Sequence, residues 1–161
     1  MLLFDRRTFL LSAVALAGCG FQPTYGPNGS GSALRGAIRV DTSGNREAYV
    51  LANKLEDIFA RPATPTYALT FNVDTDEAAV GITPEQEITR YHVTGKAKYS
   101  LVNIADGQTV ASGEVNSFTA YSATGSTVSS VTATRDAYDR LMEILADQMA
   151  AQIHAKVAVP R

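Results

Sequence analysis

The chain has 161 residues, a formal net charge of −2 at pH 7 and a single cysteine. A weakly acidic chain of this length gives no indication of nucleic-acid binding, and one cysteine excludes an intramolecular disulfide. We therefore expect one ordinary domain whose stability comes from a hydrophobic core.

The N-terminal segment has the pattern of a bacterial lipoprotein export signal. Two arginines precede a short apolar stretch, residues 9–18, and the motif Leu16-Ala17-Gly18-Cys19 closes it. About ten residues of helix rise only about 15 Å, half the thickness of a bilayer core, so the stretch is too short to span a membrane. We predict a signal peptide over residues 1–18 that is cleaved between Gly18 and Cys19.

The thiol of Cys19 is then the expected site of a lipid anchor. The modification would be a thioether-linked diacylglycerol together with an N-acyl chain, which attach a protein stably to a membrane. The alternative is a free core cysteine. By resemblance to the sorting rule of Gram-negative lipoproteins, in which aspartate after the cysteine usually marks retention in the inner membrane, Gly20 favours the outer membrane. The export route stays open, since residues 6–10 also resemble a twin-arginine signal.

Composition divides the mature part of the chain. Residues 19–34 are rich in glycine, proline and serine and are expected to form a lipidated tether. Residues 35–157 have the periodic apolar pattern of a single folded domain, and residues 158–161 form a short C-terminal tail.

The spacing of apolar residues predicts the elements of that domain. Helical spacing predicts two amphipathic helices, and alternation with a period of two predicts half-buried strands. Ser43 or Asn45 can cap the first helix, and Pro62 stops it. In chain order, the expected elements are a strand at 37–40, a helix at 45–60, strands at 67–74, 89–101 and 109–121, and a helix at 131–157.

Finer features of these elements can also be predicted. A loop with Gly81 and Pro84 should follow the second strand, Asp106-Gly107 should form a tight hairpin turn, and a bulge or bend is expected near Gly113. The long final helix should bury one stripe of side chains. This stripe comprises Ala137, Tyr138, Leu141, Ile144, Leu145, Gln148, Met149 and Ile153.

The element order predicts an α+β fold. A four-stranded sheet with two amphipathic helices is expected to form a two-layer sandwich of order β-α-β-β-β-α, with both helices on one sheet face. The other face of the sheet should then be polar.

That polar face carries the candidate binding residues. Arg90, His92, Lys96 and Lys98 lie on one side of the third predicted strand and form what we call the basic strip. The functional interpretation is a site for a phosphate or carboxylate partner. The alternative is an ordinary solvated strand face, on which lysines discourage edge-to-edge pairing.

Catalysis has no support in the sequence. The two histidines, His92 and His154, lie far apart, and the motifs of zinc proteases, serine hydrolases and phosphate-binding loops do not occur. Asp74, Asp76 and Glu77 could bind a cation, but a polar strand end is the simpler interpretation. We expect neither an enzyme nor a metal site.

Two segments resemble a known family. Residues 19–26, CGFQPTYG, resemble the start of mature lipopolysaccharide-assembly lipoproteins of the LptE type, and residues 133–138, ATRDAY, resemble the closing helix of that family. The predicted element order is similar as well. The matching apolar residues that follow in the closing helix are Leu141, Leu145, Ala146 and Ile153.

The resemblance implies a function. Members of the family plug the outer-membrane β-barrel LptD, assist its assembly and help to insert lipopolysaccharide into the outer leaflet. By this resemblance the protein would be anchored to the periplasmic side of the outer membrane, with LptD and lipopolysaccharide as partners. Arg90, Lys96 and Lys98 are the candidates for lipopolysaccharide binding. An auxiliary or solute-binding periplasmic lipoprotein of another envelope transport system remains the alternative.

Overall fold

The computed structural model describes residues 33–42, 44–82, 88–123 and 127–157. The predicted signal peptide, the lipidation site at Cys19, the tail and most of the tether lie outside these residues. The described elements in chain order are β1 (Ile38–Asp41), α3 (Arg46–Phe59), β2 (Tyr67–Ile82), β3 (Ile88–Asn103), β4 (Thr109–Ser122) and α4 (Thr127–Lys156).

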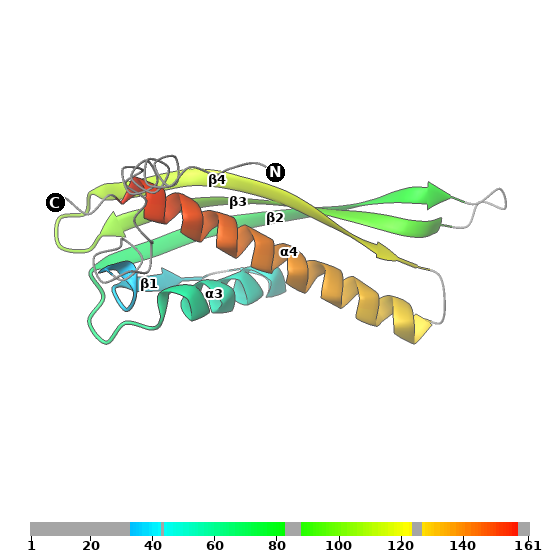
Figure 1. Ribbon diagram of the computed structural model, residues 1–161, viewed down its shortest axis with the longest axis horizontal. Helices are drawn as coiled ribbons and strands as arrows, with labels where there is room; N and C mark the ends of the chain where they lie inside the picture. Colours follow the sequence, from blue (N-terminus) through cyan, green and yellow to red (C-terminus); the bar gives the residue numbers. More distant parts are fainter. Residues whose placement is uncertain (1–32, 43, 83–87, 124–126, 158–161) are drawn as a thin grey trace, which may run out of the picture.

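The fold is the predicted α+β sandwich of order β-α-β-β-β-α. The sheet has the strand order β1-β2-β3-β4, in which β1 pairs with β2 in parallel and the other neighbours are antiparallel. Helices α3 and α4 lie on the same side of the sheet (Figure 1). None of the helices in the described part of the chain is long and apolar enough to cross a membrane.

Helix α3 closely follows its sequence signals. The side chain of Asn45 accepts a hydrogen bond from the backbone N–H of Ala48 at 3.0 Å, which satisfies one of the free donors of the first turn. The helix ends at Phe59, and Ala60 takes a left-handed φ of 58°. The backbone N–H of Gly36 donates to the Phe59 carbonyl and so caps this end of the helix.

Strand β2 is longer than predicted. It continues beyond Asp74 to Ile82, so Gly81 lies in the strand and not in a loop. The continuation pairs with β3 as far as Ile82 opposite Ile88, with register shifts on both sides of Gly81. Residues 76–80 are exposed on both faces, so the hydrogen-bond ladder holds them without any apolar alternation in the sequence.

Helix α4 begins earlier than predicted. Its first residue is Thr127, because the Ser/Thr-rich stretch that precedes Val131 is helical. Inside the helix, the Thr132 and Thr134 hydroxyls donate to the carbonyls four residues before them, so both hydroxyls are satisfied within the helix. The buried stripe also differs: Ile144 is exposed, and the buried residues that the prediction omitted are Met142, Ala146 and Ala150.

The bulge lies in β4 but not at Gly113. Gly113 pairs regularly with Tyr99, whereas the register shifts at Val110, which has no partner between the pairs Leu101–Ala111 and Val102–Thr109. Gly113 instead provides space, since a Cβ there would lie 2.6 Å from Oε1 of Gln152 on α4.

The core fills the layer between the sheet and the helices. At its centre, Gly95 of β3 lets α4 approach closely, because a Cβ at this position would lie 2.9 Å from Cδ2 of Leu141. Leu51, Leu55 and Leu141 are completely buried in this layer. The helices therefore cover one sheet face completely at the centre and leave the other available for binding.

Candidate functional site

The sheet face turned away from α3 and α4 carries the candidate site, and we call it the open face. Residues directly opposite each other on antiparallel strands point to the same face, so the partners of the basic strip on β2 and β4 belong to it. The two central rows are Asn72–Lys98–Glu114 and Asp74–Lys96–Asn116. Each lysine therefore has a carboxylate directly beside it.

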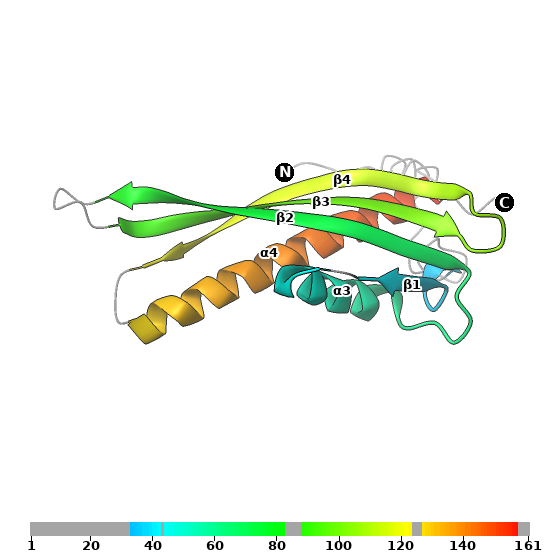
Figure 2. The same ribbon diagram turned by 180° about the vertical axis from the view of Figure 1, so that it is seen from behind.

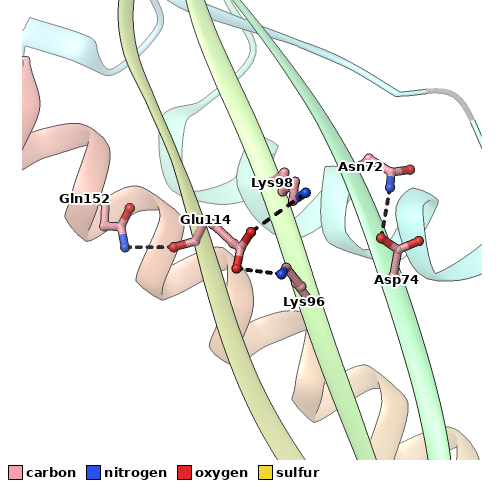
Figure 3. A network of polar contacts seen from close by, with 6 residues as sticks. All are labelled: Asn72, Asp74, Lys96, Lys98, Glu114 and Gln152. Carbon is pink, nitrogen blue, oxygen red and sulfur yellow. Dashed lines mark hydrogen bonds and ion pairs between the residues drawn. The ribbon is translucent and has the colours of Figure 1, made fainter.

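Glu114 binds both lysines of the strip. Its carboxylate lies 2.8 Å from the Lys96 ammonium and 4.0 Å from that of Lys98 (Figure 3). The three side chains are 40–66% exposed, so each ion pair is worth about 1 kcal/mol or less. On β2, the Asn72 amide donates to the Asp74 carboxylate at 3.1 Å. The open face is thus a mixed-charge surface, with its cations held in place by neighbouring anions.

Arg90 lies apart from the two lysines. It is exposed and sits opposite Gly81 and Ser122, near the far end of the β2–β3 ladder. Six residues of strand separate it from Lys96, which corresponds to about 20 Å. The structure therefore brings Lys96 and Lys98 together and places Arg90 where it would contact a different part of any bound molecule.

A groove of about 760 Å³ crosses the open face beside Lys96. An aromatic pair stands in it: Phe118 of β4 is 63% exposed, and its ring centroid lies 5.6 Å from that of His92. Asp74, Asp76 and Thr94 provide polar groups in the same groove. Phe118 is thus a large exposed apolar side chain in a polar groove, and a partner bound there would bury it.

Phe118 was not among the residues predicted from the sequence. Strand periodicity could have found it, because Val115 and Thr119 point toward the helices and Phe118 has the opposite parity. The slip in the apolar pattern of β4 obscured that parity.

The predicted acidic cluster is divided by the strand. Asp74 and Asp76 point to the open face, whereas Glu77 points to the helix side, so the three carboxylates do not converge on one cation. Glu77 accepts hydrogen bonds from Tyr121 at 2.8 Å and Tyr138 at 3.3 Å. Burial raises the pKa of both phenols, and the Glu77 carboxylate raises each further. No cluster of potential metal ligands occurs among the described residues.

The second histidine belongs to the core side of the molecule. His154 of α4 lies against Phe59 of α3, with ring centroids 5.6 Å apart. Burial lowers the pKa of His154, so its neutral form is favoured in the folded protein. It lies on the opposite side of the sheet from His92, and the two do not form one site.

Residues 27–153 match the LptE family, which is described as lipopolysaccharide-assembly. The match covers most of the chain. The chain belongs to the LptE family. It is therefore a lipopolysaccharide-assembly lipoprotein of the outer membrane, as the terminal motifs predicted. No curated protein sequence matches it.

Solved structures of other bacterial lipoproteins share the fold of this LptE-family chain. A lipoprotein from Caulobacter crescentus is 20% identical, with a TM-score of 0.68 over 80% of this chain and 95% of that chain. Rare lipoprotein B from Shewanella oneidensis is 6% identical, with a TM-score of 0.56 over 74% and 92% of the two chains. A minor lipoprotein from Acinetobacter baumannii is 12% identical, with a TM-score of 0.51 over 74% and 89%.

Proposed function

We propose that this protein occupies the lumen of the outer-membrane β-barrel LptD, assists assembly of that barrel and helps to place lipopolysaccharide in the outer leaflet. The observation that carries the proposal is the family match over residues 27–153. A lipid anchor on Cys19 would hold the domain on the periplasmic side of the membrane. Such a tether raises the effective concentration of the domain beside the barrel.

The open face supports a role as a plug. The lumen of an outer-membrane barrel is polar, so a protein inside it needs a mixed-charge surface. The rows through Lys96 and Lys98 provide this, with Glu114 and Asp74 among the cations. Phe118 adds one exposed apolar contact in the middle of the same face.

Lys96 and Lys98 are the residues that we propose for lipopolysaccharide binding, with Arg90 as a more distant contact. Phosphate groups on the lipopolysaccharide would compete with the Glu114 carboxylate for the two ammonium groups. Since these ion pairs are exposed and weak, such an exchange costs little.

The solute-binding alternative has less support. It requires a ligand cavity between the helices and the sheet, and there the described residues are tightly packed, with Leu51, Leu141 and Leu145 completely buried. The groove lies on the open face instead.

Affinity capture tests the proposed function. The full-length tagged chain is expressed in its own membrane, extracted in mild detergent and captured, and co-purifying proteins are identified by mass spectrometry. We expect LptD to be captured in stoichiometric amounts, and less of it when Cys19→Ala removes the anchor. Consistent absence of LptD from the captured material would refute the proposal.

A further inference from the structure

The two edges of the sheet differ in whether their outward backbone groups have hydrogen-bond partners in the described part of the chain. At the β4 edge, helix α4 supplies side-chain donors to three carbonyls. Lys156 donates to Ser112, Gln152 donates to Glu114 at 3.3 Å and Arg140 donates to Ala120 at 3.4 Å. Capping of this kind protects an edge strand against pairing with another chain.

The β2 edge has no such protection. Strand β1 pairs with β2 only from Tyr67 to Thr70. From Phe71 to Ile82, β3 lies along one edge of β2, and no strand in the described part of the chain lies along the other. Figure 2 shows β1 next to one end of β2 and the rest of that edge extending past it. The outer edge of β2 is therefore free to accept a partner over about three quarters of the strand, residues 71–82.

The direction of the free backbone groups follows from two hydrogen bonds at the start of β2. The N–H of Tyr67 donates to Ala37 on the β1 side, whereas the carbonyl of Thr66 accepts from Ile104 on the β3 side. The backbone N–H and C=O groups of successive strand residues point in alternate directions. Those of the odd-numbered residues of β2 therefore point away from β3, toward the outer edge of the sheet. The outward N–H and C=O groups of the free part include those of Thr75, Glu77 and Ala79.

This edge is preformed as well as free. Residues 76–80 are exposed on both faces, so a partner strand would meet no covering side chain. Pairing with β3 and the hydrogen bonds from Tyr121 and Tyr138 to Glu77 hold the strand in place. Because β2 is already extended and ordered, binding of a partner strand here loses little conformational entropy of β2.

The negative charge of β2 favours a positively charged partner strand. Strand β2 contains Asp74, Asp76 and Glu77 and no lysine or arginine. A second copy pairing edge to edge would place these carboxylates against each other, which is destabilising. A partner strand with lysine or arginine would instead be complementary, and electrostatic attraction would favour its approach.

We propose that the outer edge of β2 around Thr75–Ala79 binds an extended, basic segment of a partner protein by strand addition. Backbone hydrogen bonds to Thr75, Glu77 and Ala79 provide the affinity. The carboxylates of Asp74 and Asp76 select lysine or arginine on the added strand.

A short peptide in which lysine alternates with threonine and valine is a suitable probe. Its binding to the full-length chain in detergent is measured by fluorescence anisotropy at low salt. Two matched peptides separate the contributions, one with glutamate in place of lysine and one N-methylated at alternate amides, which keeps the charge but removes the donors of one edge. We expect both changes to weaken binding by about tenfold or more.

Variants of the chain give the reciprocal test. Ala79→Pro removes one outward N–H, which an edge strand tolerates, and Ala79→Ser is the control that keeps it. We expect Ala79→Pro to weaken peptide binding by about fivefold and Asp76→Lys to weaken it further, with unchanged circular dichroism. Equal binding of the N-methylated and unmodified peptides would overturn the proposal, as would self-association of the chain through β2.

Discussion

Tyr138 of α4 donates a hydrogen bond to Glu77 of β2 across 61 residues of sequence, at 3.3 Å. Tyr121 of β4 donates to the other oxygen of the same carboxylate and stacks on Tyr91 of β3, with ring centroids 5.2 Å apart. The Glu77 carboxylate thus joins β2 to β4 and α4, and the stacked tyrosines link this contact to β3. This contact stabilises the part of the β2–β3 ladder that extends beyond α3.

We predict that Tyr138→Phe loosens that part of the ladder. The substitution removes one hydrogen bond to a charged group at a partly exposed position, so the free energy of unfolding should fall by about 1 kcal/mol. Urea denaturation measures the fall, and hydrogen exchange should be faster in residues 76–80. Tyr49→Phe is the control, because Tyr49 is 62% exposed. Equal effects of the two substitutions would show that the Glu77 contact contributes nothing.

Gly95 should be intolerant of any side chain. A Cβ here would lie 2.9 Å from Leu141 and 3.1 Å from Leu145, in the middle of the packed layer. We expect Gly95→Ala to lower the free energy of unfolding by about 1–3 kcal/mol through overpacking. Leu141→Val shortens the side chain that is in the way, so the double variant should lose less than the sum of the single losses. Strict additivity in thermal unfolding would argue against this contact.

How closely an element could be predicted from the sequence depended on the kind of interaction that holds it in place. Helix α3 was predicted closely, since its cap at Asn45 and the stop near Pro62 are local signals. The end of β2 was missed because residues 76–80 show no apolar alternation and are held by backbone pairing and by the hydrogen bonds to Glu77. The spacing of apolar residues along the sequence does not reveal such pairing between strands.

The ion pairs of the site depend on one irregular residue. Lys96 and Lys98 were correctly placed on one strand face, but their partner Glu114 could not be predicted. The bulge at Val110 shifts the register between β3 and β4 by one residue, and without it Gly113 rather than Glu114 would share a cross-strand pair with Lys98. The sequence pattern predicts a bulge near Gly113, whereas the bulge lies at Val110. The cross-strand neighbours of Lys96 and Lys98 therefore cannot be predicted from that pattern.

We predict that His154 contributes a pH dependence to stability. Burial lowers its pKa in the folded protein below the ordinary 6.5, so the unfolded chain takes up the proton first as the pH falls. The contribution of His154 to the free energy of unfolding is complete above pH 6.5. It is lost as the pH falls from 6.5 toward the lower pKa of the folded protein. Chemical denaturation between about pH 8 and pH 5 should show a shallower loss of stability for His154→Gln than for the unchanged chain. Identical slopes would mean that His154 titrates alike in both states.

Substitution of the two lysines should weaken lipopolysaccharide binding, whereas substitution of Glu114 should strengthen it. Lys96→Gln with Lys98→Gln is expected to weaken binding on the order of tenfold at low salt, because two charge-assisted contacts are lost. Glu114→Gln should strengthen binding, since it removes the anion that competes for both ammonium groups.

The control for the lysine variants is Arg39→Gln with Arg61→Gln. Both arginines are also paired, with Asp41 and Glu56, so the control removes the same number of paired cations elsewhere. Equal loss in both double variants would show that binding responds to net charge and not to Lys96 and Lys98.

Photocrosslinking from the open face tests most directly whether this face lies inside LptD. A photoreactive amino acid replaces Phe118, which is 63% exposed in the groove, and the full-length chain is irradiated in intact cells. We predict one crosslinked product that contains LptD, with the crosslink mapped to a lumen-facing residue of the barrel. Crosslinks only to other envelope proteins, with LptD present in the same membrane, would contradict it.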